Sequence, residues 1–270
     1  MEPLTFVKWG GSLITDKATP YTIRQDVLAR LAEELGEFWR EHPGALVLGH
    51  GSGSFGHQAA TETGLAGEGL PQEQVPEALS RTQHAAGELH REVVRALRHE
   101  GLPAVSYRPS SAMIAERGAP ADVFTEPLQQ VLQLQALPVT CGDVLLDRGQ
   151  GASISSTETI FQYLINMLGT RGIPTRRVVW MGDTDGIYDA DGNTISRIEG
   201  AKTLAVSHSL GLPRGADVTG GMQHRLDVAT TLAQKGVRSI LANGLVPGRM
   251  LQLLRHDAAE GITTINPIDE

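Results

Sequence analysis

Two lysines flank a glycine turn near the start of the sequence. Lys8 stands just before Gly10-Gly11-Ser12, and Lys17 follows shortly after. Glycines let backbone N–H groups approach phosphate oxygens, and ammonium groups neutralise the charge of a phosphoryl group in transfer. A lysine at a strand end is usually only a solvated charge, but two of the four lysines of the chain lie here. We interpret this segment as a phosphate site, although the Walker A spacing G-x-x-x-x-G-K-[ST] does not occur.

A second glycine-rich segment, His50-Gly-Ser-Gly-Ser-Phe-Gly-His57, follows a predicted strand. It fits G-x-G-x-x-G, but a dinucleotide site needs a helix that begins at once and an acidic residue about 20 residues later. Residues 58–76 are rich in Gly, Glu and Pro and predict a loop. We therefore expect a turn that binds phosphate through its N–H groups, with a purely structural turn as the alternative. His57 at the mouth of this turn can donate to a phosphate oxygen or serve a structural role.

A third glycine turn, Asp217-Val-Thr-Gly-Gly221, precedes a predicted helix that carries Arg225. The helix N-terminus and the guanidinium group are suited to a nucleotide phosphate, and an ordinary helix cap with a surface arginine is an equally good interpretation. The segment Gly182-Asp-Thr-Asp-Gly186 either lines a nucleotide or only turns the chain. The nine histidines have no cysteine partners and no H-E-x-x-H spacing, so no protein metal site is predicted.

The composition excludes several classes of protein. Over 270 residues, 23 Lys+Arg against 31 Asp+Glu give a net charge of −8, which argues against a nucleic-acid partner. Cys141 is the single cysteine, so an intrachain disulfide is excluded, and we expect a cytoplasmic protein with a buried, inert thiol. No apolar run approaches the ~18 residues of a membrane span, and no signal-peptide pattern is present. We expect no membrane partner.

Strand and helix patterns alternate along the chain. Strands are predicted at 4–8, 45–49, 103–106, 137–141, 177–181, 239–242 and 262–265, a hairpin at 144–154, and helices at 23–38, 77–100, 124–135, 158–168, 221–235 and 247–254. This alternation predicts an α/β fold with a mainly parallel sheet covered on both faces. Ligands bind such sheets at the carboxyl ends of the strands, where the glycine turns lie. A second block of alternating strands and helices begins near residue 172. It divides the single domain, 1–270, into lobes of about 1–171 and 172–270.

The ordered set of motifs resembles the amino acid kinase family over nearly the whole chain. The motifs are Lys8-Trp-Gly-Gly-Ser12, Thr15-Asp-Lys17, the segment 50–57, Gly142-Asp143, Gly182-Asp-Thr-Asp-Gly186 and Asp217-Val-Thr-Gly-Gly221. The closing His57 and the T-D-K triplet, with Pro103-Ala-Val-Ser106 and Pro109-Ser-Ser111, look most like the isopentenyl phosphate kinases of that family. Fosfomycin kinases share the closing histidine. The resemblance implies a three-layer αβα sandwich that transfers a phosphoryl group from ATP to isopentenyl phosphate, giving isopentenyl diphosphate and ADP.

The same resemblance assigns roles to particular residues. It implies that Lys8, Lys17 and His57 are catalytic. The nucleotide would contact Lys8, Gly10, Gly11, Ser12, Gly53, Asp183, Gly221 and Arg225. The acceptor would contact Ser52, Gly53, His57, Ser156, Thr157, Glu158 and Ala86. The implied cofactors are ATP and Mg²⁺, the implied partner is a small-molecule phosphate substrate, and the usual association of the fold makes us expect a homodimer.

Three departures from the family pattern leave alternatives open. The S-G-D segment of the family reads Ser156-Thr157-Glu158 here, and Arg225 replaces a usual lysine, exchanging a point charge for a planar fork. The helix that walls the acceptor pocket carries small residues, Thr82, Ala86 and Gly87 beside Leu79, which suggest a deeper pocket. A longer prenyl phosphate, a phosphonate kinase of the fosfomycin type, and a non-catalytic nucleotide- or phosphometabolite-binding sensor therefore remain as alternatives.

Overall fold

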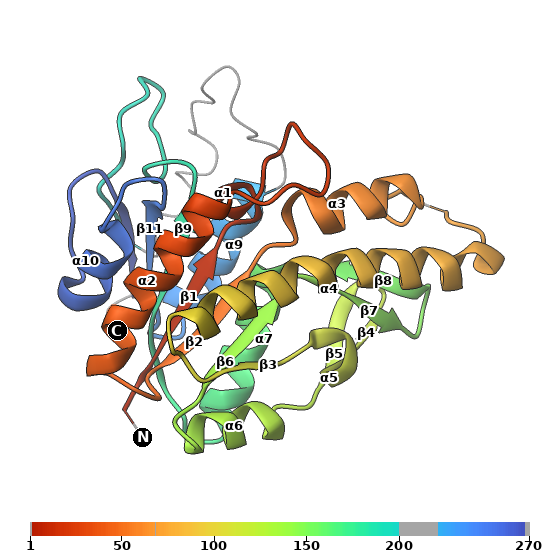
Figure 1. Ribbon diagram of the computed structural model, residues 1–270, viewed down its shortest axis with the longest axis horizontal. Helices are drawn as coiled ribbons and strands as arrows, with labels where there is room; N and C mark the ends of the chain where they lie inside the picture. The colour runs from red at the N-terminus through yellow and green to blue at the C-terminus, as the bar shows by residue number, and fades with distance from the viewer. Residues whose placement is uncertain (1, 68, 200–220, 268–270) are drawn as a thin grey trace.

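A computed structural model describes residues 2–67, 69–199 and 221–267 of the chain. Its centre is an eight-stranded sheet in the order β10-β12-β11-β9-β1-β2-β6-β3 (Figure 1). These strands are β10 Arg197–Glu199, β12 Thr263–Asn266, β11 Arg238–Asn243, β9 Thr175–Gly182, β1 Leu4–Trp9, β2 Leu46–His50, β6 Leu137–Cys141 and β3 Ala104–Ser106. Neighbouring strands run parallel except β11 and β12. The predicted mainly parallel sheet is confirmed.

Helices cover both faces of this sheet. The helices are α1 Gly11–Ile14, α2 Gln25–Glu41, α3 Gly53–Glu62, α4 Val75–His99, α5 Pro109–Ala112, α6 Glu126–Gln133, α7 Thr157–Thr170, α9 Gly221–Ala233 and α10 Arg249–His256, with a short 3-10 helix at Gln72–Gln74. The core on one face is shared by α2, α4 and α10. The core on the other face is shared by α6, α7 and α9. The fold is therefore the three-layer αβα sandwich that the family resemblance implies.

The alternation of β1 decides which way Lys8 points. All six residues of β1 are buried, because the strand lies in the middle of the sheet. Val7 and Trp9 join the core under α2 and α4, whereas Leu4 and Phe6 join the core under α7 and α9. Successive side chains of a strand point to opposite faces, so Lys8 points to the face of α7 and α9.

A small second sheet stands beside the first one. Its order is β5-β4-β7-β8, with β5 Ala119–Val123, β4 Met113–Glu116, β7 Asp143–Asp147 and β8 Gly151–Ser155. The β7–β8 hairpin confirms the hairpin predicted at 144–154. Val75 at the start of α4 packs on Val144 and Ala152 of this hairpin. The β4–β5 hairpin was not predicted, since β5 carries Pro120 and is largely exposed.

The prediction that residues 58–76 form a loop is wrong in its first part. Helix α3 begins inside the glycine-rich segment and continues to Glu62. Ala59 and Ala60 are buried on this helix, which packs along α4. Two small apolar residues give little helical periodicity, so the sequence pattern does not predict a helix here.

Cys141 is fully buried, and burial raises the pKa of its thiol far above its ordinary value. This agrees with the expected inert cysteine. Within the three described stretches of the chain, every helix is too short or too polar to cross a lipid bilayer.

The docking of α7 on the sheet gives a test of the fold. Phe161 of α7 packs edge-on against Phe6, with ring centroids 4.9 Å apart, and has no exposed surface. Replacing it by alanine leaves a cavity, so we expect Phe161→Ala to lower the free energy of unfolding by about 3–5 kcal/mol in urea titrations. Phe124, which is 55% exposed, is the matched control, and Phe124→Ala should cost about 0.5 kcal/mol or less. Equal losses in the two variants would contradict this packing.

Candidate active site

The first two glycine turns touch each other backbone to backbone. They follow β1 and β2, which pair in parallel and so end at the same edge of the sheet. A Cβ atom on Gly11 would lie 2.5 Å from the Gly53 nitrogen, and one on Gly51 would lie 2.6 Å from the Gly11 nitrogen. Any side chain at these positions would force the turns apart. The glycines therefore let two sets of N–H groups converge on one small volume, as a pair of phosphates requires.

Thr15 joins the two turns, although in the sequence it stands out only as part of the T-D-K triplet. Its hydroxyl donates to the Gly11 carbonyl oxygen at 2.7 Å and accepts from the Ser54 N–H at 2.9 Å. Gly53 has a φ of +49°, and a Cβ atom there would lie 2.2 Å from the Thr15 hydroxyl oxygen. The T-D-K triplet that contains Thr15 was the available signal, but its spacing says nothing about a contact across 39 residues.

Helix α3 begins at Gly53, with Ser52 as its N-terminal boundary residue. The N–H groups of a first helical turn have no partner inside the helix and attract anions. A helix therefore follows the glycine turn at once. The loop expected there was one of the two reasons against a dinucleotide site, and that reason is wrong. The second requirement, an acidic residue that ends the next strand, is still not met, since β3 ends at Ser106.

Lys8 forms a buried ion pair with Glu158 of α7, as its position on β1 demands. Arg225 of α9 donates to the same carboxylate oxygen, with 3.2 Å between its Nε and Oε1. The Lys8 side chain is 6% exposed and the Glu158 side chain 7%. One carboxylate therefore holds two cations at the end of β1, beside the glycine turns.

Burial and charge act in opposite directions on this cluster. Burial lowers the pKa of Lys8 to about 8, and the Arg225 cation adds to this, while Glu158 opposes it. Burial alone would raise the pKa of Glu158, but Lys8 and Arg225 outweigh it and bring that pKa down to about 2. At neutral pH the carboxylate is charged and Lys8 carries a proton that it can lose in mildly alkaline solution.

Lys17 and Asp183 extend this edge of the sheet toward solvent. The Lys17 ammonium nitrogen lies 3.9 Å from Asp183 Oδ2, and both side chains are about half exposed, at 50% and 40%. Asp183 follows β9 directly, next to Gly182. Asp16 accepts from the Ala18 N–H and from the Thr19 hydroxyl, which fixes the turn on which Lys17 stands. The structure thus brings Lys17 and the predicted nucleotide-side Asp183 together.

The first turn of α7 orients Glu158. Ser156 caps this helix by accepting from the Thr159 N–H at 3.1 Å, and Thr157 donates to the His50 carbonyl oxygen at 2.7 Å. His224 of α9 contacts the Ser156 and Thr159 hydroxyls at 3.0 and 2.9 Å. These contacts tie α9 to the start of α7, which places Arg225 against Glu158. Of the predicted substrate contacts, Thr157 and Glu158 are buried and Ser156 is partly exposed.

The nucleotide-side residues lie around this cluster. Gly10 is buried, and Ser12 is partly exposed in α1. Gly221 is exposed at the start of α9, and Arg225 reaches Gly182, where an added Cβ atom would lie 3.5 Å from its Nη1. The remainder of the third motif, Asp217 to Gly220, lies outside the described residues.

His57 and Ala86 lie on helices that pack together. His57 is exposed on α3. Ala86 is buried on α4, and a Cβ atom on Gly56 of α3 would be 3.8 Å from the Ala86 Cβ. At Gly87 an added Cβ atom would lie 3.0 Å from the Arg108 guanidinium, which itself pairs with Asp143. Ala86 thus packs against α3, whereas Gly87 lines a hollow of about 390 Å³ that Arg108 borders.

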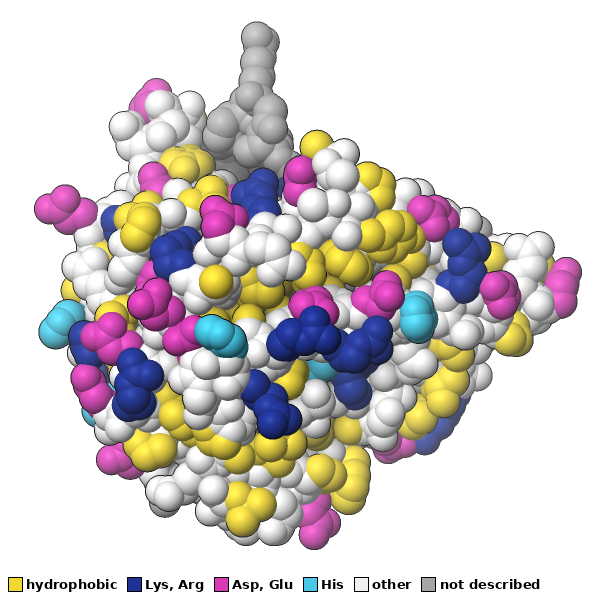
Figure 2. All heavy atoms as spheres, viewed as in Figure 1, with side chains coloured by type: hydrophobic (Ala, Val, Ile, Leu, Met, Phe, Trp, Pro, Cys, Tyr) yellow, Lys and Arg dark blue, Asp and Glu magenta, His cyan; other side chains and the backbone are white. Residues whose placement is uncertain are grey.

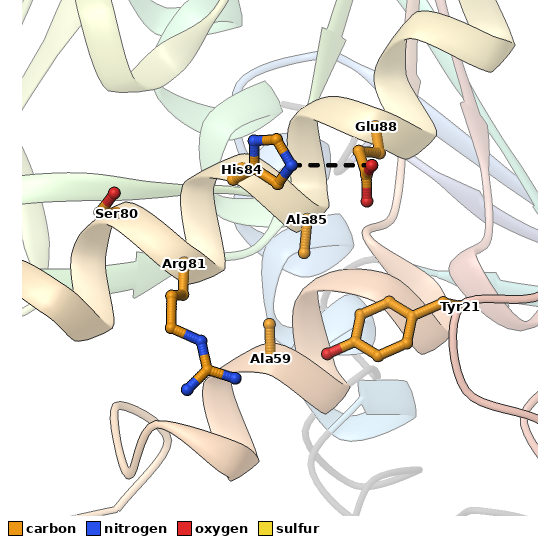
Figure 3. Close-up of a pocket in the computed structure, with 7 residues that line it drawn as sticks. All are labelled: Tyr21, Ala59, Ser80, Arg81, His84, Ala85 and Glu88. Atoms are coloured by element: carbon orange, nitrogen blue, oxygen red, sulfur yellow. Dashed lines mark ion pairs between the residues drawn. The ribbon is translucent and has the colours of Figure 1, made fainter.

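The outer side of α4 is polar. Arg81, Arg91, Arg95 and Arg98 are exposed there, and Figure 2 shows basic side chains gathered over the middle of this helix. A shallow hollow of about 400 Å³ lies between α3 and α4, with Ala59 and Ala85 facing each other across it (Figure 3). Charged and aromatic side chains surround it, among them the His84–Glu88 pair. This hollow is separate from the Lys8–Glu158 cluster on the opposite face of the sheet.

The fold and the site together define a member of the amino acid kinase family, to which this chain belongs: the family model matches residues 3–243. Two curated relatives are isopentenyl phosphate kinases. The protein of Methanothermobacter thermautotrophicus is 32% identical over 268 residues, covering 96% of this chain and 97% of the relative. The protein of Methanocaldococcus jannaschii is 28% identical, covering 89% of this chain and 91% of the relative.

Solved structures agree with this assignment. A structure titled "X-ray structures of isopentenyl phosphate kinase" matches with a TM-score of 0.79 and 29% identity, covering 97% of this chain and all of that one. N-acetylglutamate synthase from Neisseria gonorrhoeae matches with a TM-score of 0.71 over 99% of this chain and 60% of its own, at 17% identity. The latter likeness concerns the fold alone.

The depressed pKa of Lys8 predicts a pH dependence. An ammonium group stabilises phosphoryl charge only when it is protonated, so if Lys8 contacts the transferring group, phosphoryl transfer should fall as the pH rises through about 8. Glu158→Gln removes the carboxylate that raises this pKa, so the alkaline fall should move to lower pH in a kcat/KM profile for ATP. In the control Lys8→Arg, the residual rate should lack this fall because arginine does not deprotonate. An unchanged alkaline limb in Glu158→Gln would show that another group causes it.

The contact between the two turns predicts that Gly53 is intolerant of any side chain. Gly53→Ala places a methyl group against the Thr15 hydroxyl and should displace the turns by about 1 Å, lowering kcat/KM by about a hundredfold. Gly69 is the matched control, since it also has a positive φ of +75° but no atom within 4 Å of an added Cβ. Gly69→Ala should keep nearly full activity in the same assay. Similar losses in both variants would mean that backbone strain, rather than the contact with Thr15, is responsible.

Proposed function

We propose that this chain is an ATP-dependent kinase that phosphorylates isopentenyl phosphate to isopentenyl diphosphate. One observation carries the proposal: two glycine turns in backbone contact stand beside a buried lysine, Lys8, in a chain whose relatives are isopentenyl phosphate kinases over nearly their whole length. Such a site can hold two phosphate groups close together, which is the main difficulty when one polyanion attacks another. The relatives favour this acceptor over a phosphonate.

The reaction needs positioning and charge more than a base. An acceptor phosphate oxygen attacks the γ-phosphorus of ATP, the new O–P bond forms, and the bond to the β–γ bridging oxygen breaks to release ADP. Because a phosphate oxygen is largely deprotonated near neutral pH, a strong general base is not required. Lys8 and Lys17 neutralise the transferring phosphoryl group, and His57 donates to the acceptor phosphate.

Backbone N–H groups share the remaining charge. The Gly10 N–H is already donated to the Met181 carbonyl oxygen at 2.8 Å, so the expected phosphate contact of that N–H is not kept. The Gly11 N–H faces the nucleotide phosphates, and those of Ser52 and Gly53 at the start of α3 hold the acceptor. Arg225 lies on the nucleotide side. Residues 1–171 thus form the lobe of the acceptor, and residues 172–270 form the lobe of the nucleotide.

Mg²⁺ would enter with the phosphates of ATP. This ion keeps several waters and takes few protein oxygens beside substrate phosphates. Glu158 already holds two cations, whereas Asp183 is partly exposed at the same edge and fits as a single oxygen ligand or its water-mediated equivalent. When bound, the ion would supply additional positive charge to the phosphates of ATP.

We propose that a prenyl chain would lie against the apolar cluster at the start of α4. Leu65, Leu70 and Leu79 pack on the cluster of Val75, Val144 and Ala152, between the first turns of α4 and the β7–β8 hairpin. An apolar cluster here suits a hydrocarbon chain better than a small polar phosphonate. We propose in addition that the protein is a cytoplasmic homodimer, which light scattering on the purified chain would test.

Purified protein should release ADP in a coupled assay with isopentenyl phosphate. Lys17→Met and His57→Ala should each lower turnover by about a hundredfold, because each removes a group that contacts a reacting phosphate. Matched controls are Lys235→Met, at a lysine bonded to Asn166, and His99→Ala, at an exposed histidine that ends α4. Both controls should keep wild-type rates.

Three outcomes would overturn parts of this proposal. Turnover of another phosphate or phosphonate, without isopentenyl or dimethylallyl phosphate, would replace the substrate. ATP binding without ADP release on any acceptor would indicate a sensor instead of an enzyme. Wild-type rates in Lys17→Met or His57→Ala would remove the role given to that residue.

A further inference from the structure

A chain of hydrogen bonds runs beneath the second glycine turn. His50 ends β2 and His90 lies on α4; both are buried, and His50 Nε2 is 3.0 Å from His90 Nδ1. The outer nitrogen of His90, Nε2, lies 2.9 Å from the Ser106 hydroxyl oxygen. The outer nitrogen of His50, Nδ1, lies 3.0 Å from the carbonyl oxygen of Gly51. The mechanism proposed above uses neither histidine.

One carbonyl group fixes the direction of every bond in this chain. The Gly51 carbonyl oxygen can only accept, so His50 Nδ1 must carry a proton. Burial lowers the pKa of His50 to about 4 and that of His90 to about 2, so both rings are neutral and carry one proton each. His50 Nε2 therefore accepts from His90 Nδ1, and His90 Nε2 accepts from the Ser106 hydroxyl.

The orientation of the Gly51 carbonyl decides where the next N–H points. In a trans peptide the C=O and N–H groups point in opposite directions, and the described residues contain no cis peptide. Since the Gly51 carbonyl faces the buried His50 ring, the Ser52 N–H faces away from it. Gly51 has no side chain to resist a rotation of this peptide, and the bond from His50 to its carbonyl oxygen opposes that rotation directly.

We propose that His90 is a positioning residue for the acceptor phosphate: through His50 it holds the Gly51–Ser52 peptide with its N–H turned toward that phosphate. This inference rests on the proposed function, in which the Ser52 N–H binds the acceptor. His90 itself touches no substrate. Its action is to keep His50 in the one tautomer that can donate to Gly51.

The geometry favours this reading over a metal site. Cys141 lies beside the two rings, and the three ligand atoms are within 4.8 Å of one another. In the structure, however, the facing ring nitrogens bond directly to each other, and their outer nitrogens are satisfied by Ser106 and Gly51. Metal content is therefore an outcome of the test rather than part of the proposal.

Steady-state kinetics of three variants separate positioning from stability. His90→Leu keeps the bulk and removes the donor, and it should raise the KM for isopentenyl phosphate about tenfold while leaving the KM for ATP within about twofold. His90→Asn keeps an N–H near the place of Nδ1 and should restore most of the loss. Val93→Ala, at a buried position one turn along α4, should lower the thermal midpoint and leave both KM values unchanged. An equal rise in both KM values, or no rescue by asparagine, would overturn the proposal.

A second measurement does not depend on the identity of the acceptor. ¹⁵N NMR of the imidazole rings should show the proton on Nδ1 of both His50 and His90 from about pH 5 to about pH 9. Added inorganic phosphate should shift the Ser52 amide resonance in the wild type and not in His90→Leu. A proton on His50 Nε2, a bound metal ion in elemental analysis, or an equal amide shift in both proteins would overturn the proposal. If the wild type fails to use isopentenyl phosphate but passes this test, only the proposed function is wrong.

Discussion

Two cations buried next to each other repel strongly, because burial removes the water that would screen them. Lys8 and Arg225 are placed in this way at the end of β1, and the Glu158 carboxylate between them makes the arrangement stable. Three elements must be in register for this: β1 turns Lys8 to one face, the capped start of α7 presents Glu158, and α9 supplies Arg225. Removing the carboxylate would leave two unpaired buried cations, so the floor of the site depends on it.

Backbone contact supplies what the charges alone cannot. A cluster of charges attracts a phosphate without orienting it, whereas N–H groups in fixed positions do both. Gly11, Gly51 and Gly53 allow the two turns to approach until only backbone separates them, and the Thr15 hydroxyl holds that approach from both sides. Neutral groups therefore fix the geometry, and charged groups set the local potential. The buried histidines beneath Gly51 add a third layer that is also neutral.

The sequence predicted the features that depend on local patterns. Central strands such as β1, in which most residues are apolar, were predicted from the local pattern, and the glycine turns follow β1 and β2 at one edge of the sheet. Contacts between distant segments cannot be predicted from local patterns: no spacing in the chain shows that Thr15 contacts Ser54. The small residues at Ala86 and Gly87 predicted space beside α4, but a sequence does not reveal their neighbours: Ala86 packs against α3, and Gly87 lines a hollow with Arg108. The start of α3 was missed for a related reason, since Ala59 and Ala60 are buried by α4 without forming an apolar stripe.

The central claim is that burial and Arg225 act against Glu158 to give Lys8 an unusually acidic ammonium group. With Lys8, Lys17, Lys202 and Lys235 as the four lysines of the chain, NMR titration of the lysine side chains can be assigned by single substitutions. The Lys8 resonance should titrate with a pKa of about 8, far below that of an ordinary lysine. A Lys8 pKa near the ordinary value of about 10.4 would contradict the account, because the ammonium would then not be buried between Glu158 and Arg225 as described.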